Sequence, residues 1–380
     1  MLKVLAACAA GVVCLAGCAG TIALPKSSPS TLGAKSPAAD VRARMALLMG
    51  EHTYVLAKLA VAAVAGRKDE YGSYANLLAI NGDDLSAVFS RAAGESQANK
   101  FGRAWLLGDS FFVDYTVAVT TRQQDLADAA MMNLNTKYVP QAAAAISAPL
   151  NISMATATRM FVDNLTATKQ LIDDAAAGAP SAFYPDLRAA YTKSIGIGGS
   201  LAEAIAWKFP DKYPGDATSV GANARAQLDA LLQEHAYLLS MTTDAASSGA
   251  TPEGGAAATS LEASTQDLSR AIASIFGAQA GAQAAQLWND EDKSFIAYAS
   301  AADDPAKTAA LNSLNQTSTP ALTSFLNGLH VTADVASVTQ QTIGVIDDQR
   351  AKSYSVLAAE DRQSAALLIS IGDLLMKVSG

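Results

Sequence analysis

The chain has 380 residues; 50% are hydrophobic and 16% are charged, and its formal net charge is −8. This length and composition suit two packed domains of ordinary size and argue against global disorder. An acidic chain without a lysine or arginine cluster is a poor nucleic-acid binder, so no nucleic acid is expected among its partners. The abundance of alanine and the short β-branched runs favour helices.

The first twenty residues carry the most specific motif. A short basic segment, Met1-Leu2-Lys3, precedes an apolar segment from Val4 to Leu15, and Leu15-Ala16-Gly17-Cys18 follows where cleavage is expected. This pattern resembles a bacterial lipoprotein signal with its lipobox. The resemblance implies diacylglyceryl attachment to the Cys18 thiol, cleavage before Cys18 and subsequent N-acylation. The alternatives are an ordinary signal peptide or a short anchor helix, although the apolar segment is too short to span a bilayer comfortably.

The resemblance also implies a cellular location. The mature protein is expected to be extracytoplasmic and held on the cell membrane or the outer membrane through lipid, with an envelope protein as a further partner. Removal of residues 1–17 would take Cys8 and Cys14 away and leave neither a free thiol nor a disulfide. Without Lys3, 26 basic residues stand against 35 acidic ones, for a net charge of −9. Residues 18–37, rich in Ser, Pro and Gly, are predicted to form a flexible tether.

A six-residue motif occurs twice along the chain. Glu51-His52-Thr53-Tyr54-Val55-Leu56 returns 183 positions later as Glu234-His235-Ala236-Tyr237-Leu238-Leu239. The same offset pairs Asp84-Leu85-Ser86 with Asp267-Leu268-Ser269, Trp105 with Trp288, Asp109 with Asp292, and Tyr115 with Tyr298. The offset then drifts to 180 at Pro140 and Pro320, and to 174 at Ile172-Asp173-Asp174 and Ile346-Asp347-Asp348. We infer a tandem duplication, with repeat 1 over 38–216 and repeat 2 over 217–380.

Apolar residues at spacings of three and four predict helices throughout both repeats. In repeat 1 the expected helices run from 38 to near Gly66, then over 68–93, 95–119, 122–147, 151–177 and 181–208. In repeat 2 they cover 219–248, 253–276, 278–301, 304–327, 329–350 and 352–378. Gly82 could break or kink the second helix, Pro140 is expected to kink or split the fourth, and residues 207–215 form the linker. The prediction is an all-α fold of two tandem antiparallel helical bundles, with about six helices each.

The duplicated histidines are the first candidates for chemistry. His52 and His235 lie on the apolar faces of their helices, and Asp109 and Asp292 lie on aromatic faces. A buried His–Asp hydrogen bond in each repeat, with Tyr54, Tyr237, Glu51 or Glu234 nearby, would serve packing alone. Tyr54, Tyr237, Trp105, Trp288, Tyr115 and Tyr298 are then structural signatures of the repeat.

The alternative is a transition-metal site for copper, zinc or iron in each repeat. Its ligands would be Glu51, His52 and Asp109 in repeat 1, and Glu234, His235 and Asp292 in repeat 2. The repeats are loosely similar to uncharacterised ferritin-like helical domains, but no Glu-x-x-His motif occurs, which counts against a di-iron carboxylate site. Met45, Met49 and His52 share one helix face that would suit Cu(I), but the corresponding positions in repeat 2 are Leu228 and Leu232.

Catalytic signals are weak. No Gly-x-Ser-x-Gly elbow occurs, and the Gly-rich run Gly196-Ile197-Gly198-Gly199 lies in a helical pattern without a preceding strand. Asp173-Asp174 and Asp347-Asp348 fit solvated helix termini, and His330 has no counterpart in repeat 1. The sequence therefore favours a non-catalytic, lipid-anchored protein with a binding or envelope-interaction role, and metal binding is the alternative.

Overall fold

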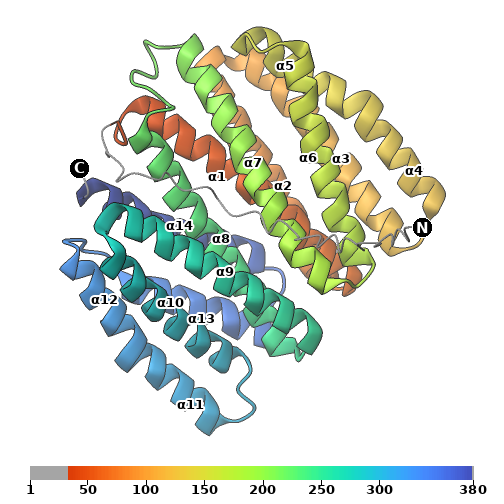
Figure 1. The fold of residues 1–380 in the computed structure, drawn as a ribbon. Helices are drawn as coiled ribbons and strands as arrows, with labels where there is room; N and C mark the ends of the chain where they lie inside the picture. The colour runs from red at the N-terminus through yellow and green to blue at the C-terminus, as the bar shows by residue number, and fades with distance from the viewer. Residues whose placement is uncertain (1–32, 379–380) are drawn as a thin grey trace, which may run out of the picture.

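The computed structural model describes residues 33–378 (Figure 1). The lipobox, Cys18 and most of the expected tether lie outside these described residues. Throughout 33–378 the regular secondary structure is helical, without a strand, so the predicted all-α class is confirmed.

The described chain consists of two successive sets of helices. The first set comprises α1 (Pro37–Val64), α2 (Lys68–Ala93), α3 (Glu95–Thr120), α4 (Gln124–Asn133), the π-helical turn η1 (Leu134–Tyr138), α5 (Val139–Leu150), α6 (Met154–Ala176) and α7 (Pro180–Lys208). The second comprises α8 (Val220–Ser248), α9 (Thr251–Phe276), α10 (Ala278–Ala299), α11 (Asp304–Ser313), the π-helical turn η2 (Leu314–Ser318), α12 (Thr319–Gly328), α13 (Val335–Ala351) and α14 (Leu357–Val378). Both sets have the same order of elements, which is consistent with the inferred duplication.

The helix predicted over 122–147 is divided where the sequence placed the disruption. Pro140 is the second residue of α5, and η1 lies directly before that helix. Pro320 occupies the same position in α12, directly after η2. A proline cannot donate to the preceding turn and crowds its carbonyl, so a widened turn at this point is physically reasonable. Each set therefore has seven α-helices rather than about six.

The second helix differs from the prediction. α2 runs unbroken through Gly82, because a glycine costs only about 1 kcal/mol inside a helix and the packing around it can offset that amount.

α1 and α8 begin in the same way: Ser36 Oγ accepts a hydrogen bond from the Ala39 N–H at 3.1 Å, and Ser219 Oγ accepts one from the Ala222 N–H at 3.2 Å. Each serine satisfies a backbone donor that the first helical turn leaves free.

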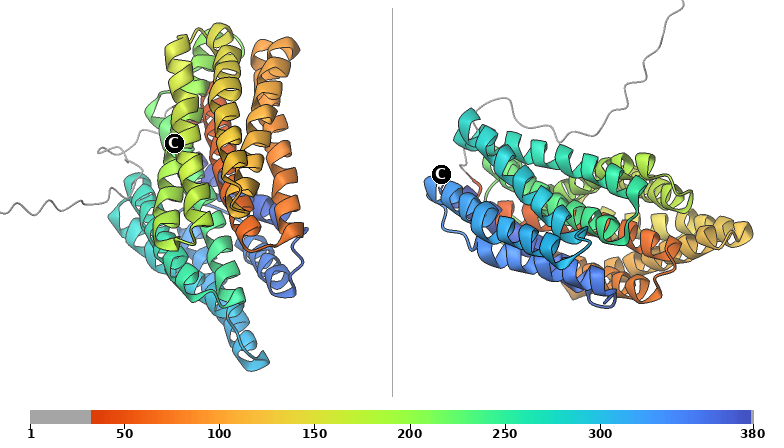
Figure 2. Two further views of the ribbon diagram at one scale, coloured as in Figure 1. Left: turned by 90° about the vertical axis from the view of Figure 1, so that its right-hand side faces the viewer. Right: turned by 90° about the horizontal axis from the view of Figure 1, so that it is seen from below.

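The two sets interlock at the centre of the molecule. α1 packs against α8, α7 covers α1 and also packs on α9, and α14 covers α8 and also packs on α2. In Figure 1 the outer edges are formed by α4 at one end and α11 at the other, and Figure 2 shows the flattened array from two further sides. The last helix of each set therefore packs against a helix of the other set.

The helix α1 is the core helix of the first set. Among the described helices it alone is long and apolar enough to cross a membrane, but most of its residues are buried by the surrounding helices. Its contact with α7 is close because α7 carries the glycine run: a Cβ at Gly198 would stand 2.5 Å from the Met45 carbonyl oxygen. The run lies within a helix, as its pattern predicted, and Gly198 lies where this helix crosses α1.

Candidate functional site

Each set of helices contains one buried His–Asp pair. His52 Nε2 on α1 lies 2.8 Å from Asp109 Oδ1 on α3, and His235 Nε2 on α8 lies 3.2 Å from Asp292 Oδ1 on α10. All four residues are buried. The His52 ring also meets the Trp105 ring edge-on, with 4.7 Å between centroids. The hydrogen bond expected from the two helix faces is present in the first set, whereas the histidine and aspartate of the second set are in ion-pair contact without one.

The adjacent glutamates face other neighbours. Successive helical residues point about 100° apart, so Glu51 is directed away from Asp109. Its carboxylate binds Arg362 of α14, with 3.0 Å from Arg362 Nε to Glu51 Oε1. Arg362 also contacts Asp84 of α2, and Asn81 Nδ2 donates to Glu51 Oε2 at 2.8 Å. Glu51 is therefore a partner of the second set's last helix.

Glu234 repeats this arrangement with the two sets exchanged. Arg188 of α7 donates from Nε to Glu234 Oε1 at 3.2 Å and from Nη2 to Glu234 Oε2 at 3.1 Å. Arg188 Nη2 also donates to Asp267 Oδ2 of α9 at 2.6 Å. The planar guanidinium suits this two-pronged contact. Asp84 and Asp267, the aspartates of the duplicated Asp-Leu-Ser motif, thus bind corresponding arginines.

The duplicated tyrosines meet at the junction of the two sets. The rings of Tyr54 and Tyr237 stack with 5.0 Å between centroids and 10° between planes. The Tyr237 hydroxyl donates to Glu51 Oε1 at 3.3 Å. Further out, Tyr115 donates to Asp173 Oδ1 at 2.6 Å, and Tyr298 donates to Asp347 Oδ1 at 2.7 Å. The duplicated tyrosines therefore make helix-to-helix contacts within and between the sets.

The six candidate metal ligands consequently do not surround common points. In each set the histidine and aspartate form one pair, and the glutamate belongs to an arginine cluster on another side of the helix. Within residues 33–378, no group of three or more His, Cys, Asp and Glu side chains is arranged to hold a metal ion. His330 is exposed beyond the end of α12, with φ of 62°.

Burial affects the two pairs differently. Burial raises the pKa of the Asp109 carboxyl, and His52 opposes that shift. At the other pair burial lowers the pKa of His235, but Asp292 and then Glu291 and Glu234 outweigh it, so the net pKa lies above the ordinary value. Burial also raises the pKa of Glu291 to about 7. The second set thus holds one more buried carboxyl group near its histidine, because the corresponding position in the first set is Gly108.

Two features of this interior were not predicted from the sequence. Arg188 and Arg362 are separated by 174 positions, the same offset as the two Ile-Asp-Asp motifs, so that offset was a usable signal. The other feature is a buried cluster between the sets: Lys58 Nζ donates to Asp361 Oδ2 at 2.5 Å and to Ser240 Oγ at 2.8 Å. The residue that corresponds to Lys58 is Met241, so the repeat pattern gave no signal for it.

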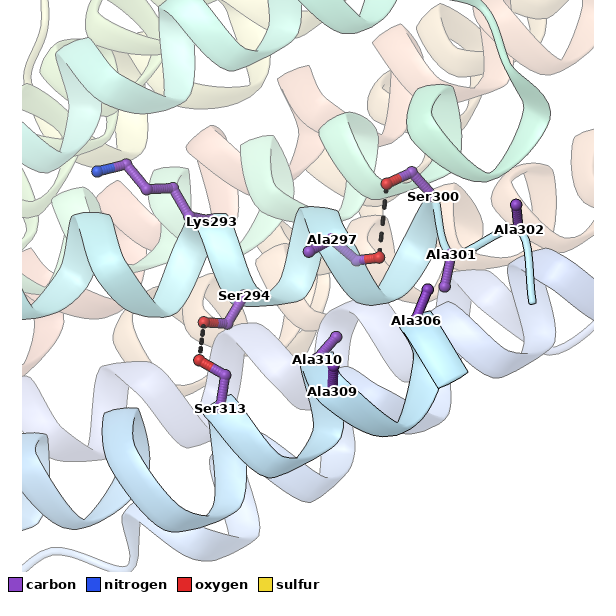
Figure 3. A pocket seen from close by; sticks show the side chains of 10 residues that line it. All are labelled: Lys293, Ser294, Ala297, Ser300, Ala301, Ala302, Ala306, Ala309, Ala310 and Ser313. Carbon is purple, nitrogen blue, oxygen red and sulfur yellow. Dashed lines mark hydrogen bonds between the residues drawn. The ribbon is translucent and has the colours of Figure 1, made fainter. Parts of the chain in front are cut away.

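A hollow between α10 and α11 has few side chains that could bind a polar ligand. Figure 3 shows that it is lined mainly by alanine side chains, and Ser294 and Ser313 hydrogen-bond each other at 2.9 Å. The Ser300 hydroxyl donates to the Ile296 carbonyl at 2.8 Å. Its serine hydroxyls are therefore engaged within the protein.

A second hollow, of about 390 Å³, lies between α2 and α3 and reaches the buried Asp109. Its floor includes Gly82 and Gly102, and Asp83, Asn99 and Arg103 stand at its exposed margin. The candidate residue Asp109 thus lines a surface hollow. No protein-family model, curated protein or solved structure matches the chain.

Proposed function

We propose that this chain is a lipid-anchored, extracytoplasmic helical protein with a non-catalytic binding role at the cell envelope. The observation that carries the proposal is the segment Leu15-Ala16-Gly17-Cys18 after a short basic and a longer apolar segment. Acyl chains on Cys18 would hold the protein on the membrane, because two or more chains give stable anchoring.

The way the described chain begins is compatible with such an anchor. Ala34 is buried, and its carbonyl accepts a hydrogen bond from Arg225 Nη1 at 3.1 Å. Lys35 Nζ donates to the Lys377 carbonyl at 3.1 Å, near the end of α14. Residues 19–32 can span at most about 50 Å. A membrane anchor at Cys18 would therefore hold the end of the molecule where α1 and α8 begin within about 50 Å of the bilayer.

The non-catalytic part of the proposal is supported by the buried clusters. The duplicated His, Asp and Glu side chains are paired with one another or with arginines inside the protein. The duplicated motifs are accounted for by packing between helices, so no reaction is needed to explain them.

The anchor is tested with the full chain and a Cys18→Ser variant expressed in a bacterium that processes lipoproteins. We expect the wild-type protein in the membrane fraction, with an N-terminal peptide that starts at Cys18 and carries acyl mass. Protease added to cells with an opened envelope should digest it. The variant should lack the acyl mass and leave the membrane fraction. Wild-type protein without acylation, or shielded from protease in the cytoplasm, would contradict the proposal.

A further inference from the structure

The two His–Asp pairs differ at one position. In the second set, Thr265 Oγ1 donates to Asp292 Oδ2 at 3.1 Å and lies 3.5 Å from His235 Nδ1. The residue at the corresponding position of the first set, 183 positions earlier, is Gly82. At this position the first set therefore supplies no hydroxyl to the pair.

The polar atoms around Gly82 lack partners as a result. Asp109 Oδ2 and His52 Nδ1 are buried without a hydrogen bond, and so is Trp105 Nε1. In the second set the indole nitrogen of Trp288 and Asp292 Oδ1 also lack partners, so the difference between the sets lies at the carboxylate Oδ2 and the imidazole Nδ1. Buried polar groups are normally satisfied, and an exception calls for an explanation.

The space for a partner is present. The hollow of about 390 Å³ between α2 and α3 is lined by both Gly82 and Asp109. A Cβ at Gly82 would stand 3.7 Å from Asp109 Oδ2, 3.7 Å from Trp105 Nε1 and 3.1 Å from Trp105 Cδ1. A threonine here would occupy this space, as Thr265 does in the second set. The glycine has no side chain that would separate Asp109 from the hollow, which both residues line.

The unpaired atoms restrict the chemistry of an occupant. The hydroxyl of Thr265 donates to Asp292 Oδ2 and lies beside His235 Nδ1, so a group at this place in the first set must donate to Asp109 Oδ2 and must meet His52 Nδ1 by donating or accepting, according to the tautomer. A hydroxyl can do both, whereas an ammonium has no acceptor and a carboxylate has no donor. At the margin of the hollow, Asp83 supplies acceptors, Arg103 supplies donors and Asn99 supplies both, while Ser86, whose hydroxyl donates to the Gly82 carbonyl, supplies an acceptor. This alternation suits several hydroxyl groups on one molecule.

We propose that this hollow binds a small neutral polyhydroxyl compound, a sugar or a polyol, with one hydroxyl placed where Thr265 Oγ1 lies in the second set. The volume is within the range of small-molecule sites. The inference rests on the proposed binding role and gives it a site and a ligand class. Arg103 and Asp83 would bind the outer hydroxyls, and Asp109 and His52 the innermost one.

The test uses full-length protein in a detergent without a sugar headgroup. Glucose, N-acetylglucosamine and myo-inositol are titrated at millimolar concentrations, with choline and acetate as charged probes. Binding is followed by the shift of Tm and by ligand-observed magnetisation transfer. We expect at least one polyhydroxyl probe to raise Tm in a saturable manner, and neither charged probe to do so.

Matched glycine variants locate the site. Gly82→Ser supplies the missing hydroxyl from the protein, and we expect probe binding to weaken by at least about tenfold. Gly72→Ser, on the same helix with open space around it, should bind as the wild type does. Binding unchanged in Gly82→Ser would overturn the proposal. So would a wild-type protein that binds none of the three polyhydroxyl probes, since the hollow would then hold water alone. Mass analysis of the N-terminal peptide in the same sample tests the lipid anchor separately.

Discussion

At the scale of single residues, adjacent side chains of the duplicated motif contact different sets of helices. His52 points to Asp109 within its own set, while Glu51 binds Arg362 of the other set. Tyr54 stacks on Tyr237 between them. One turn of helix therefore carries both an internal contact and a contact across the junction, which explains why the motif recurs as a unit.

Arg188 and Arg362 make equivalent contacts in different surroundings. The Arg188 side chain is 7% exposed and that of Arg362 is 27% exposed. Removing one partner from a buried ion pair leaves the other charge uncompensated, so Arg188→Met should lower the free energy of unfolding by about 3–5 kcal/mol. Arg362→Met should cost less, because water can reach the remaining carboxylates. Urea unfolding of both variants measures the difference, and equal losses would contradict this account.

The buried carboxyl of Glu291 makes stability depend on pH. Its pKa of about 7 lies above the ordinary value of 4.5, so between these values the folded state binds the proton that the unfolded state has lost. The contribution of this carboxyl to stability is therefore fully present below about pH 4.5 and is lost as pH rises through 7, a change on the order of 3 kcal/mol. The raised pKa of His235 acts in the same direction, with its contribution lost as pH rises through the folded-state value.

Glu291→Gln removes this carboxyl while keeping its shape. Comparison of the free energy of unfolding at pH 5 and pH 8 should give a smaller fall for the variant than for the wild type. Some fall will remain, because burial also raises the pKa of Glu70 to about 7. A wild type and a variant with the same pH dependence would show that Glu291 is ionised in the folded protein.

At the scale of helices, the crossing of α1 and α7 depends on one glycine of the Gly-rich run. A Cβ at Gly198 would lie 2.5 Å from the Met45 carbonyl oxygen and 2.8 Å from Ala46 Cα, whereas one at Gly196 would meet open space. Both residues lie in α7, so Gly198→Ala and Gly196→Ala differ only in this contact. Gly196→Ala should stabilise by about 0.5–1 kcal/mol through helix propensity.

Gly198→Ala should instead destabilise by about 1–3 kcal/mol, because two helix backbones must move apart. Thermal and urea unfolding of the two single variants provide the comparison. Similar effects at both positions would mean that α1 and α7 do not approach each other as closely as described here.

Much of this helical framework could be predicted from the sequence. The apolar spacing predicted a helix over residues 68–93, which are the bounds of α2. Pro140 marked the division between α4 and α5. The pairing of His52 with Asp109 followed from two inward-facing helix sides. The widened turn η1 and the crossing at Gly198 could not be predicted, because they depend on the separation of neighbouring helices. The contacts of Arg188 and Lys58 depend on how the two sets dock, which periodicity within one helix does not encode.

At the scale of the whole molecule, the two sets pack against each other through several helices rather than forming separate domains. α7 packs on α9 and α14 packs on α2, so each set covers apolar surface of the other. One apolar cluster contains Leu187 and Tyr191 of α7 together with Leu231 and Leu268 of the second set. Even the connection is held in place: Ala217 is buried, and Lys212 Nζ donates to the Ala92 carbonyl at 2.9 Å at the end of α2.

Separate expression of residues 33–216 and 217–380 tests this interlocking. Each half alone would expose the Tyr54 or Tyr237 face and leave the buried charge of Glu51 or Glu234 without its arginine. We expect each half to aggregate or to lack cooperative unfolding, and co-expressed halves to form a 1:1 complex. The control is a full chain with a protease site at residues 209–219, cut after folding; it should keep its two pieces associated during size-exclusion chromatography. A half that is monomeric and unfolds cooperatively by itself would show that the junction is an accessory to two self-sufficient bundles, and the crossed arginines would then orient the bundles rather than hold their cores together.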